Sequence, residues 1–514
     1  MKCLPSIEKV NGIWNLYVDG QPFTALSGEI HNSSASNLRY MKEQVWPYLR
    51  EMNMNSVAVP IYWEKIEAIE NEFDFTLLDG ILKQAREEEM KLTLLWFGLW
   101  KNGISSYVPE WVKTDGSKYL RVRNSNGKAM DVISPLCEVA VEADKKAFMK
   151  VMSHLKEVDA EEQTVIMVQV ENEIGLLGSD RDYSTYANEQ YEKKIPKVMV
   201  ELYSVSGTWE EAFKENAPEY FMEYYYAKAI ERIACESKLV YGLPMYVNAW
   251  LEKFPWRPGG YPSGGPIARF IKLWHGIAPS ISVYSPDIYS SDFVGVCDEY
   301  TIEDNPLLIP EVRRDAMNSS NVFYAIGKYN VLCYSPFGIE DFKKPLELLT
   351  GLSNPNLMKT LKIDTSAFNC DKTAGYLSKS YGILNSMMPL IRKCREDRKL
   401  HSFIRKDEHE RGCVIEMKDY DVRINFQNNQ VGIPKSAGII LEIADNEFYI
   451  IGTSVNYTVM PKKNENVTVG FLNLEEGEFE NGEFVAFEVL NGDERYFTNL
   501  YDMPSINRVK LYKY

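Results

Sequence analysis

The amino-acid sequence predicts an α/β fold: a (β/α)8 TIM barrel of eight parallel strands, followed by a C-terminal all-β sandwich or jelly-roll domain. Between about residues 23 and 340, short apolar runs alternate with longer segments of helical periodicity, which is the pattern of a β/α barrel. After about residue 395 the pattern changes to short alternating strands separated by turn residues. The length of 514 residues favours two or three domains with a large core.

Eight apolar runs are the predicted barrel strands: Phe23–Ser27, Ser56–Ile61, Leu92–Phe97, Val165–Val170, Pro244–Val247, Ile281–Tyr284, Leu307–Ile309 and Val331–Tyr334. Each is nearly continuous in apolar residues, as strands are when helices cover both faces of a sheet. Amphipathic segments such as 77–90, 144–157 and 219–237 lie between them. An open doubly wound sheet would alternate in the same way, but no GxGxxG or Walker sequence follows a run, which disfavours a nucleotide-binding sheet.

The domain organisation follows from the same change of pattern. We assign residues 1–395 to a catalytic barrel and residues 396–514 to a β domain, whose turns are predicted at Glu476-Gly477, Asn481-Gly482 and Asn491-Gly492. This domain has a structural role or, as an alternative, binds sugar. Two long intervals, 171–243 and 250–280, follow predicted strands and are expected to shape the pocket, because insertions after strands lie on the catalytic face of a barrel.

Composition excludes several classes of function. A net charge of −16, from 73 acidic and 57 basic residues, argues against a nucleic-acid partner. No run of about 18 apolar residues occurs, so no membrane span is expected, and the N-terminus lacks the apolar region of a secretory signal. Eight scattered Cys without a CxxC pair suggest reduced thiols in a cytoplasmic protein. Five dispersed His without HExxH predict neither a metal nor another cofactor.

The strongest chemical signal is the segment Gln169–Gly175, with the sequence QVENEIG, at the end of the fourth predicted strand. Polar residues at the carboxyl end of a barrel strand are typical of catalytic groups. Strand alternation places Gln169, Glu171 and Glu173 on one face, and three polar groups on an otherwise apolar strand are costly to bury without a function. A solvated loop with ordinary acidic residues is the alternative interpretation.

The second signal is Glu311, which follows the seventh apolar run in the sequence LLIPEVRRD. Arg313 or Arg314 is predicted to hold Glu311 ionised, since a nearby cation favours the charged carboxylate. A surface salt bridge is the alternative. Cleavage of a glycoside with retention needs one protonated and one ionised carboxyl group about 5–5.5 Å apart, and Glu173 with Glu311 would supply that pair.

At these residues the chain resembles a known group of enzymes. Asn-Glu after strand four and Pro-Glu after strand seven resemble the retaining β/α-barrel glycosidases, and more narrowly the family 35 β-galactosidases, with kinship to family 42. Further support comes from Ser27–His31 (SGEIH), Trp63–Phe75 and Leu94–Gly103. The tail resembles the small β domain of a bacterial subset of these enzymes, so the resemblance covers nearly the whole chain.

The resemblance implies a role for each matching position. Glu173 matches the acid/base, Glu311 the nucleophile, and Asn172 the residue that hydrogen-bonds the sugar 2-hydroxyl. Glu171 matches a neighbouring acid that is often seen in family 35. Tyr289 falls where related enzymes place a Tyr near the nucleophile.

Four further residues are predicted to contact substrate: Glu29, His31, Trp96 and Trp250. The first two belong to the SGEIH stretch, and the two Trp are candidate stacking platforms for sugar rings. For the two Trp, as for Tyr289, a core role is the open alternative.

Departures from the family 35 pattern bear on the sugar. Many members carry a carboxylate after strand three that binds galactose hydroxyls, whereas this chain has Trp96–Lys101 there, without an acid. The predicted activity is that of an exo-acting β-galactosidase on short oligosaccharides, with another β-glycosidase specificity, transglycosylation and non-catalytic sugar binding as alternatives. The oligosaccharide is the expected partner, and the resemblance favours self-association as a homo-oligomer.

Overall fold

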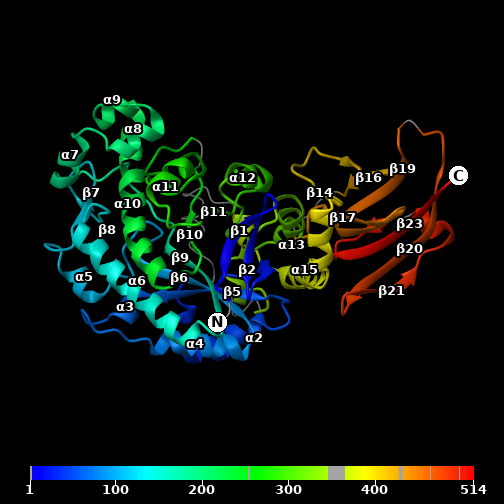
Figure 1. Cartoon of the computed structure of the whole chain (residues 1–514), viewed down its shortest axis with the longest axis horizontal. Coiled ribbons are helices and arrows are strands. Elements are labelled where there is room, and N and C mark those ends of the chain that lie inside the picture. The colour runs from blue at the N-terminus through cyan, green and yellow to red at the C-terminus, as the bar shows by residue number, and fades with distance from the viewer. Residues whose placement is uncertain (1–2, 253–254, 345–364, 428–431, 464, 497) are drawn as a thin grey trace.

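The computed structural model describes residues 3–252, 255–344, 365–427, 432–463, 465–496 and 498–514. Figure 1 shows an elongated molecule with a helix-covered barrel at one end and β-sheets at the other. No helix in the described ranges is both long enough and apolar enough to cross a membrane.

The barrel has eight strands, and each overlaps one of the eight predicted apolar runs, although several bounds differ by two or more residues. They are β4 (Ala25–Leu26), β5 (Ser56–Tyr62), β6 (Lys91–Lys101), β9 (Val165–Asn172), β10 (Met245–Ala249), β11 (Val283–Ile288), β12 (Ile309–Val312) and β13 (Cys333–Pro336). Neighbouring strands are parallel, in the order β4-β13-β12-β11-β10-β9-β6-β5. The sheet closes just after β4, where Ala58 accepts from Ile30 N–H at 3.2 Å and donates to Gly28 O at 2.9 Å. The predicted fold class is confirmed.

Helices cover the outside of the barrel (Figure 1). In α4 (Thr76–Glu87) the buried residues recur at helical spacing: Leu78, Ile81, Leu82 and Ala85. The longest helices on the barrel are α6 (Glu138–Asp159), α10 (Ala217–Val240) and α15 (Thr373–Glu396).

The amino ends of the strands are closed by an antiparallel sheet of β1 (Ser6–Val10), β2 (Ile13–Val18) and β3 (Gln21–Phe23). Leu16 and Val18 of β2 pack with strand residues at that end of the barrel, namely Ile166, Met167, Val283, Leu308 and Leu332. Polar groups of the barrel are therefore reached from the opposite, carboxyl end of the strands, which is the usual catalytic face.

The interval 171–243 that follows β9 forms α7 (Thr185–Tyr191), α8 (Lys197–Tyr203), α9 (Trp209–Phe213) and α10. In Figure 1 the first three lie together at one end of α10. The interval 250–280 contributes α11 (Ile271–Ile277), which packs on α10 and α8.

The C-terminal part is a sandwich of two antiparallel sheets. One is ordered β14-β17-β18-β23-β20-β21 and the other β15-β16-β19-β22. Their bounds are β14 (Leu400–Ile404), β15 (Gly412–Glu416), β16 (Tyr420–Phe426), β17 (Ala437–Ala444), β18 (Glu447–Thr453), β19 (Val455–Pro461), β20 (Val469–Glu480), β21 (Glu483–Val489), β22 (Asn499–Leu500) and β23 (Ser505–Lys513). Side chains of both sheets, such as Ile450 and Val422, share one core.

The other face of the six-stranded sheet packs on the barrel. Ile439, Ile451 and Ile506 belong to the same apolar core as the barrel strands, and β17 contacts α13 (Met317–Tyr324) and α15. Of the predicted turns, Asn481-Gly482 joins β20 to β21 with φ angles of 51° and 84°. The turn predicted at Glu476-Gly477 is wrong, because these residues form a β-bulge inside β20.

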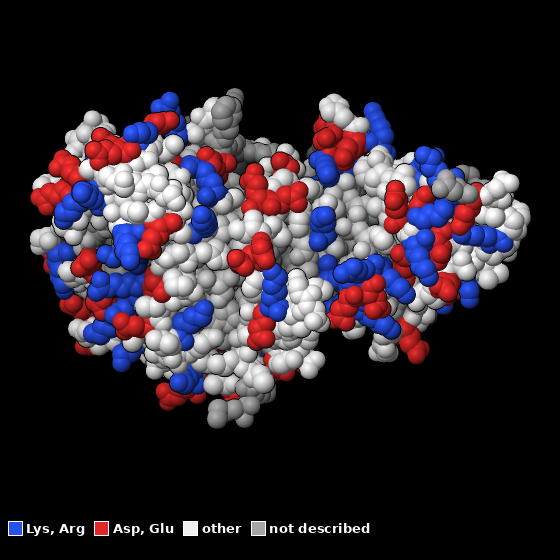
Figure 2. Space-filling view, turned by 45° about the horizontal axis from the view of Figure 1, so that its top comes forward, with Lys and Arg blue, Asp and Glu red and all other residues white. Residues whose placement is uncertain are grey.

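On the face drawn in Figure 2, described Lys and Arg side chains are interspersed with Asp and Glu side chains. Among the described residues, Lys145 and Arg232 each pair with Glu142. That face therefore lacks the extended basic surface that would follow a nucleic-acid backbone, within the part of the chain that the structure describes.

Candidate active site

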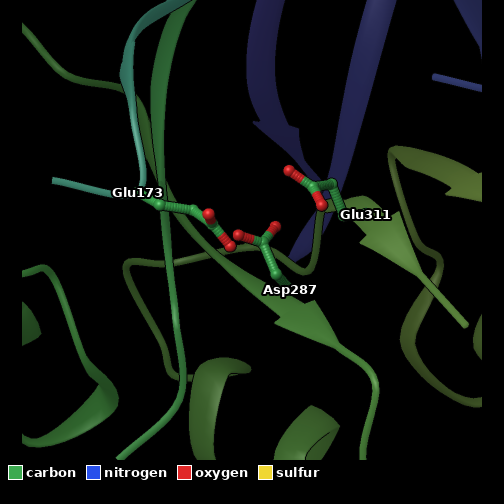
Figure 3. A group of neighbouring side chains, drawn as sticks. All are labelled: Glu173, Asp287 and Glu311. Carbon is green, nitrogen blue, oxygen red and sulfur yellow. The ribbon is translucent and has the colours of Figure 1, made fainter. Parts of the chain in front are cut away.

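Three carboxyl groups converge at the carboxyl ends of the barrel strands. Glu173 directly follows β9, Asp287 lies in β11 and Glu311 in β12, and one oxygen of each lies within 4.8 Å of one oxygen of the other two. Figure 3 shows Asp287 between Glu173 and Glu311, with the three side chains pointing toward one another. Only 3%, 1% and 4% of Glu173, Asp287 and Glu311 is exposed, so they form a desolvated acidic cluster.

The backbone at the carboxyl end of β9 departs from regular strand geometry. Glu171 and Glu173 have left-handed φ angles of 62° and 44°, a conformation in which strand alternation does not hold. Glu173 and Asn172 therefore both face the acidic cluster, while Glu171 turns toward the helices. The predicted common face for Gln169, Glu171 and Glu173 is wrong for this reason.

Glu171 lies behind the active site, not in it. Its carboxylate accepts hydrogen bonds from the backbone of Leu99 at 3.1 Å and of Trp100 at 2.6 Å, and it lies beside Asp144 of α6. Burial and the charge of Asp144 raise the pKa of Glu171 well above its usual value. The predicted substrate contact for Glu171 is thus wrong, because the side chain is enclosed between a strand and a helix.

Trp96 has the same location. Its indole N–H donates to Asp144 at 2.7 Å, its ring packs on Phe148 of α6, and no part of it is exposed. The prediction that Trp96 stacks on sugar is wrong, and its open alternative, a core role, is what the structure shows.

Because Gly98 has no side chain, the buried carboxyl groups of Asp144 and Glu171 can occupy the space beside it. A Cβ atom at Gly98 would lie 2.5 Å from Asp144 Oδ2, Glu171 Oε1 and Trp96 Nε1. Gly98→Ala should therefore lower the free energy of unfolding by about 1–3 kcal/mol, the usual cost of overpacking a core. Urea denaturation measures it. Gly116→Ala, where a Cβ meets nothing within 4 Å, is the control, and equal effects of the two substitutions would contradict the expected clash.

Glu311 is held by two hydrogen-bond donors. The Tyr289 hydroxyl donates to one carboxylate oxygen at 2.6 Å, and the Asn172 amide donates to the other at 3.4 Å. Burial and the charge of Glu311 raise the pKa of Tyr289 well above its usual value, so the phenol keeps its proton and donates it. Tyr289 thus lies beside the predicted nucleophile, where the resemblance placed it.

The two arginines after Glu311 do not contact it. Arg313 pairs with Asp315 through two hydrogen bonds of 2.7 Å, and Arg314 pairs with Asp341 at 2.8 Å. The predicted pairing of one of them with Glu311 is therefore wrong, because local carboxylates bind both guanidinium groups. The side-chain donors to Glu311 are Tyr289 and Asn172.

Tyr289→Phe should reduce kcat/KM about 10- to 100-fold, since a hydrogen bond to a charged group contributes about 1.5–3 kcal/mol. The ring would keep its stacking on Phe368, so the fold should survive. Steady-state kinetics with a nitrophenyl glycoside tests this. The control is Tyr334→Phe, which removes a hydroxyl bonded to a backbone carbonyl away from the acids. Unchanged kinetics in Tyr289→Phe would show that the hydroxyl does not support Glu311 during turnover.

Glu173 has the environment of a group that is protonated near neutral pH. Burial and the charge of Glu311 raise its pKa to about 7. The Asn102 amide donates to the Glu173 carboxylate, and the Glu173 backbone N–H donates to Asn248 Oδ1 at 2.9 Å. Together these contacts fix both the backbone and the carboxyl group of Glu173.

Four residues of the site were missed in the sequence: Lys101, Asn102, Asn248 and Asp287. Lys101 lies opposite Asn172 in the β6–β9 pairing and donates to its amide oxygen at 2.6 Å, which turns the amide N–H toward Glu311. All four lie at carboxyl ends of barrel strands, and that position was the signal that could have found them.

The remaining predicted contacts lie around this cluster. Glu29 is fully buried beside it, and neither of its carboxylate oxygens has a hydrogen-bond partner in the part of the chain that the structure describes. Burial and the charge of Glu311 raise the pKa of Glu29 well above its usual value. His31 is partly exposed and bonds Asp341 at 2.6 Å. Trp250 directly follows β10 and is half-buried, so its stacking role stays a prediction.

Glu173, Asp287 and Glu311 are also the described residues whose oxygens could meet at a cation. Burial and the charge of Glu311 raise the pKa values of Glu173 and Asp287. Buried carboxyl groups of this kind suit proton transfer and nucleophilic attack.

Two family models match parts of the chain. The model described as "Beta-galactosidase", of glycoside hydrolase family 42, matches residues 38–221. The model described as "Domain of unknown function (DUF5597)" matches residues 377–501. The match is thus to family 42, and the narrower resemblance to family 35 stays a prediction. No curated protein matches the sequence.

Solved structures with a similar course of the chain are distant in sequence. The β-galactosidase from Bacillus circulans sp. alkalophilus is 11% identical, with 95% of this chain and 99% of that chain covered and a TM-score of 0.47. The β-galactosidase from Rahnella sp. R3 is 13% identical, with 71% and 56% covered and a TM-score of 0.46. The β-amylase catalytic domain from Paenibacillus polymyxa is 12% identical, with 62% and 92% covered and a TM-score of 0.46.

The family 42 match includes Lys101, Asn172 and Glu173, and the barrel brings Glu311 to the same place. Paired carboxyl groups in a desolvated pocket are what the cleavage of glycosidic bonds requires. The chain is therefore an enzyme, a glycosidase with a β-galactosidase-type domain in its barrel.

Proposed function

We propose that this protein is a retaining, exo-acting β-glycosidase that removes terminal β-linked galactose from short oligosaccharides. The observation that carries the proposal is the separation of two carboxyl groups: one oxygen of Glu173 lies within 4.8 Å of one oxygen of Glu311. Retaining enzymes hold their carboxyl groups about 5–5.5 Å apart, whereas inverting enzymes leave about 6.5–9.5 Å for a water molecule. The close approach supports direct attack by Glu311.

The reaction has two steps. Glu311 attacks the anomeric carbon, and Glu173 donates its proton to the leaving oxygen as the glycosidic bond breaks. The ester that forms at Glu311 removes a negative charge, so the pKa of Glu173 falls and its carboxylate can accept a proton. Water then loses a proton to Glu173, attacks the anomeric carbon and releases both the sugar and Glu311 with net retention.

Asn172 is assigned to the sugar 2-hydroxyl. Its amide nitrogen lies 3.4 Å from Glu311, close to where the attacked carbon and its neighbour would lie, and Lys101 fixes its orientation. A hydrogen bond to this hydroxyl strengthens in the transition state, when positive charge develops on the ring.

The burial of the site supports exo attack. The carboxyl groups that face the sugar are at most 4% exposed, which favours attack on a chain end over attack within a polymer. Galactose is the first candidate because the matched model is that of β-galactosidases.

The test is hydrolysis of nitrophenyl β-galactoside, β-glucoside, β-xyloside, β-fucoside and α-arabinoside, with the first-formed anomer followed by proton NMR. We expect the β-galactoside to be preferred and the β-anomer to appear first. Another preferred sugar would keep the mechanism and replace the specificity. An α-anomer as first product would refute retention, and no hydrolysis of these compounds or of natural oligosaccharides would refute the function. A cytoplasmic location and self-association as a homo-oligomer stay predictions.

A further inference from the structure

The pocket contains one carboxyl group more than the two-step reaction uses. Asp287 is 1% exposed, directly opposite Glu311 in the β11–β12 pairing, and within 4.8 Å of Glu173 and Glu311 (Figure 3). A buried acid between a nucleophile and an acid/base is costly unless its proton or its hydrogen bonds serve the site.

The hydrogen bonds of Asp287 lead to Glu173. Asn248 donates from its amide nitrogen to Asp287 Oδ2 at 2.8 Å, and its amide oxygen accepts the backbone N–H of Glu173 at 2.9 Å. This bridge ties Asp287 to a residue whose φ is 44°, a conformation that needs support from outside. The carboxyl groups of Asp287 and Glu173 are adjacent, with one oxygen of each within 4.8 Å of the other. Asp287 Oδ1 is buried and has no hydrogen-bond partner among the described residues.

The charges of neighbouring groups decide whether the Asp287 carboxyl group is protonated. Its ionisable neighbours come from several elements around it: Glu311 on β12, Glu173 after β9, Glu29 after β4, Tyr246 on β10 and Tyr300 at the end of α12 (Phe293–Tyr300). Lys101 on β6 acts on Glu29 and Glu173. Glu311 must be ionised to attack, and a second negative charge within 4.8 Å in a desolvated pocket is unfavourable. Burial and these charges raise the pKa of Asp287 well above its usual value.

We propose that Asp287 is a positioning residue that keeps its proton throughout the cycle, donates a hydrogen bond to Glu173 and fixes the backbone of Glu173 through Asn248. The inference rests on the proposed retaining mechanism and assigns a group that this mechanism does not use. A neutral donor stabilises the ionised form of Glu173 and so holds its pKa near the value that both steps require.

The experiment compares pH–rate profiles of Asp287→Asn and Asp287→Ala with the wild type, in EDTA, on glycosides with good and poor leaving groups. Asn can accept from Asn248 and donate to Glu173, whereas Ala can do neither. The exposed Asp304→Asn is the control, since it removes a carboxylate outside the pocket. Melting temperatures confirm folding. If Asp287→Ala does not fold, Asp287→Leu replaces it, because Leu also can neither accept from Asn248 nor donate to Glu173.

We expect Asp287→Asn to retain kcat/KM within about tenfold and to keep the alkaline limb of the profile near pH 7. In Asp287→Ala the midpoint of the alkaline limb should rise by about half a pH unit, because the hydrogen-bond donor to Glu173 is lost. In the same variant, kcat/KM for the glycoside with the poor leaving group should fall about 100-fold. If Asp287 were ionised, both substitutions would remove a negative charge and move the limb down. That downward shift would overturn the proposal. Profiles identical to that of the wild type would overturn it as well. So would an equal loss of activity in both variants without any shift of the alkaline limb.

Failure of this inference is distinguishable from failure of the proposed function. If the wild type hydrolyses no glycoside, or Glu311→Gln remains active, the proposed function fails. If the wild type is active, Glu311→Gln is inactive and the limb shifts down in Asp287→Asn, the function stands and only the protonated state of Asp287 is refuted.

Discussion

Glu311→Gln should abolish turnover, with kcat reduced at least about 10⁴-fold, equivalent to about 5.5 kcal/mol of lost transition-state stabilisation. Gln retains the shape, and its one amide oxygen can still accept from Tyr289, but its amide cannot form the glycosyl ester. Steady-state kinetics on the preferred nitrophenyl glycoside measures the loss. Activity within about tenfold of the wild type, a change of only about 1.4 kcal/mol, would refute the assignment.

The loss of activity in Glu311→Gln should not be accompanied by a loss of thermal stability. The charge of Glu311 raises the pKa values of Glu29, Glu173 and Asp287, so a neutral side chain relieves repulsion within the cluster. We expect the melting temperature of Glu311→Gln to be at least that of the wild type, and the pKa of Glu173 to fall below about 7. Glu223→Gln, a fully buried acid bonded to Trp274 on the helices, is the matched control and should retain full activity.

Glu173→Ala should lower kcat/KM by about 10²- to 10⁴-fold on a glycoside with a poor leaving group, which is the usual contribution of a general acid. A nitrophenyl glycoside needs less protonation, so its first step should be affected less. Wild-type activity should decline as pH rises through about 7, because Glu173 must be protonated to donate, and this limb should be absent in the variant.

Added azide provides a second readout for Glu173. A small anion can enter the space left by the carboxylate and attack the glycosyl ester without a general base, so the rate on the nitrophenyl glycoside should recover and a β-glycosyl azide should form. Glu189→Ala, an exposed acid on α7, should show neither the loss nor the recovery. An alkaline limb that persists in Glu173→Ala would assign the acid/base role to another group.

Much of the fold could be predicted because barrel strands covered on both faces are apolar throughout, and all eight runs became strands. Glu173 and Glu311 could be found because a carboxylate directly after such a run is conspicuous. Tyr289 and Asn172 followed from the resemblance, and the structure brings both to Glu311.

The rest depends on backbone details that a one-dimensional pattern does not contain. The left-handed φ angles at Glu171 and Glu173 reverse which residues face the pocket, so Glu171 was misplaced. Strand β6 continues to Lys101, beyond its predicted end at Phe97, and this extension places Lys101 opposite Asn172. Asp287 lies near the carboxyl end of β11, which marks it as a candidate, but the sequence indicates neither the direction of its side chain nor its protonation.

The six-stranded sheet shares its inner face with the barrel, and this has a consequence for how such a chain can evolve. Ile439, Ile451 and Ile506 are at most 1% exposed and belong to the barrel core, while β17 contacts α13, the helix that follows β12 and Glu311. A barrel without this sheet would present a broad apolar surface to water. The two halves cannot be exchanged independently between genes, and substitutions at their seam should arise in compensating pairs.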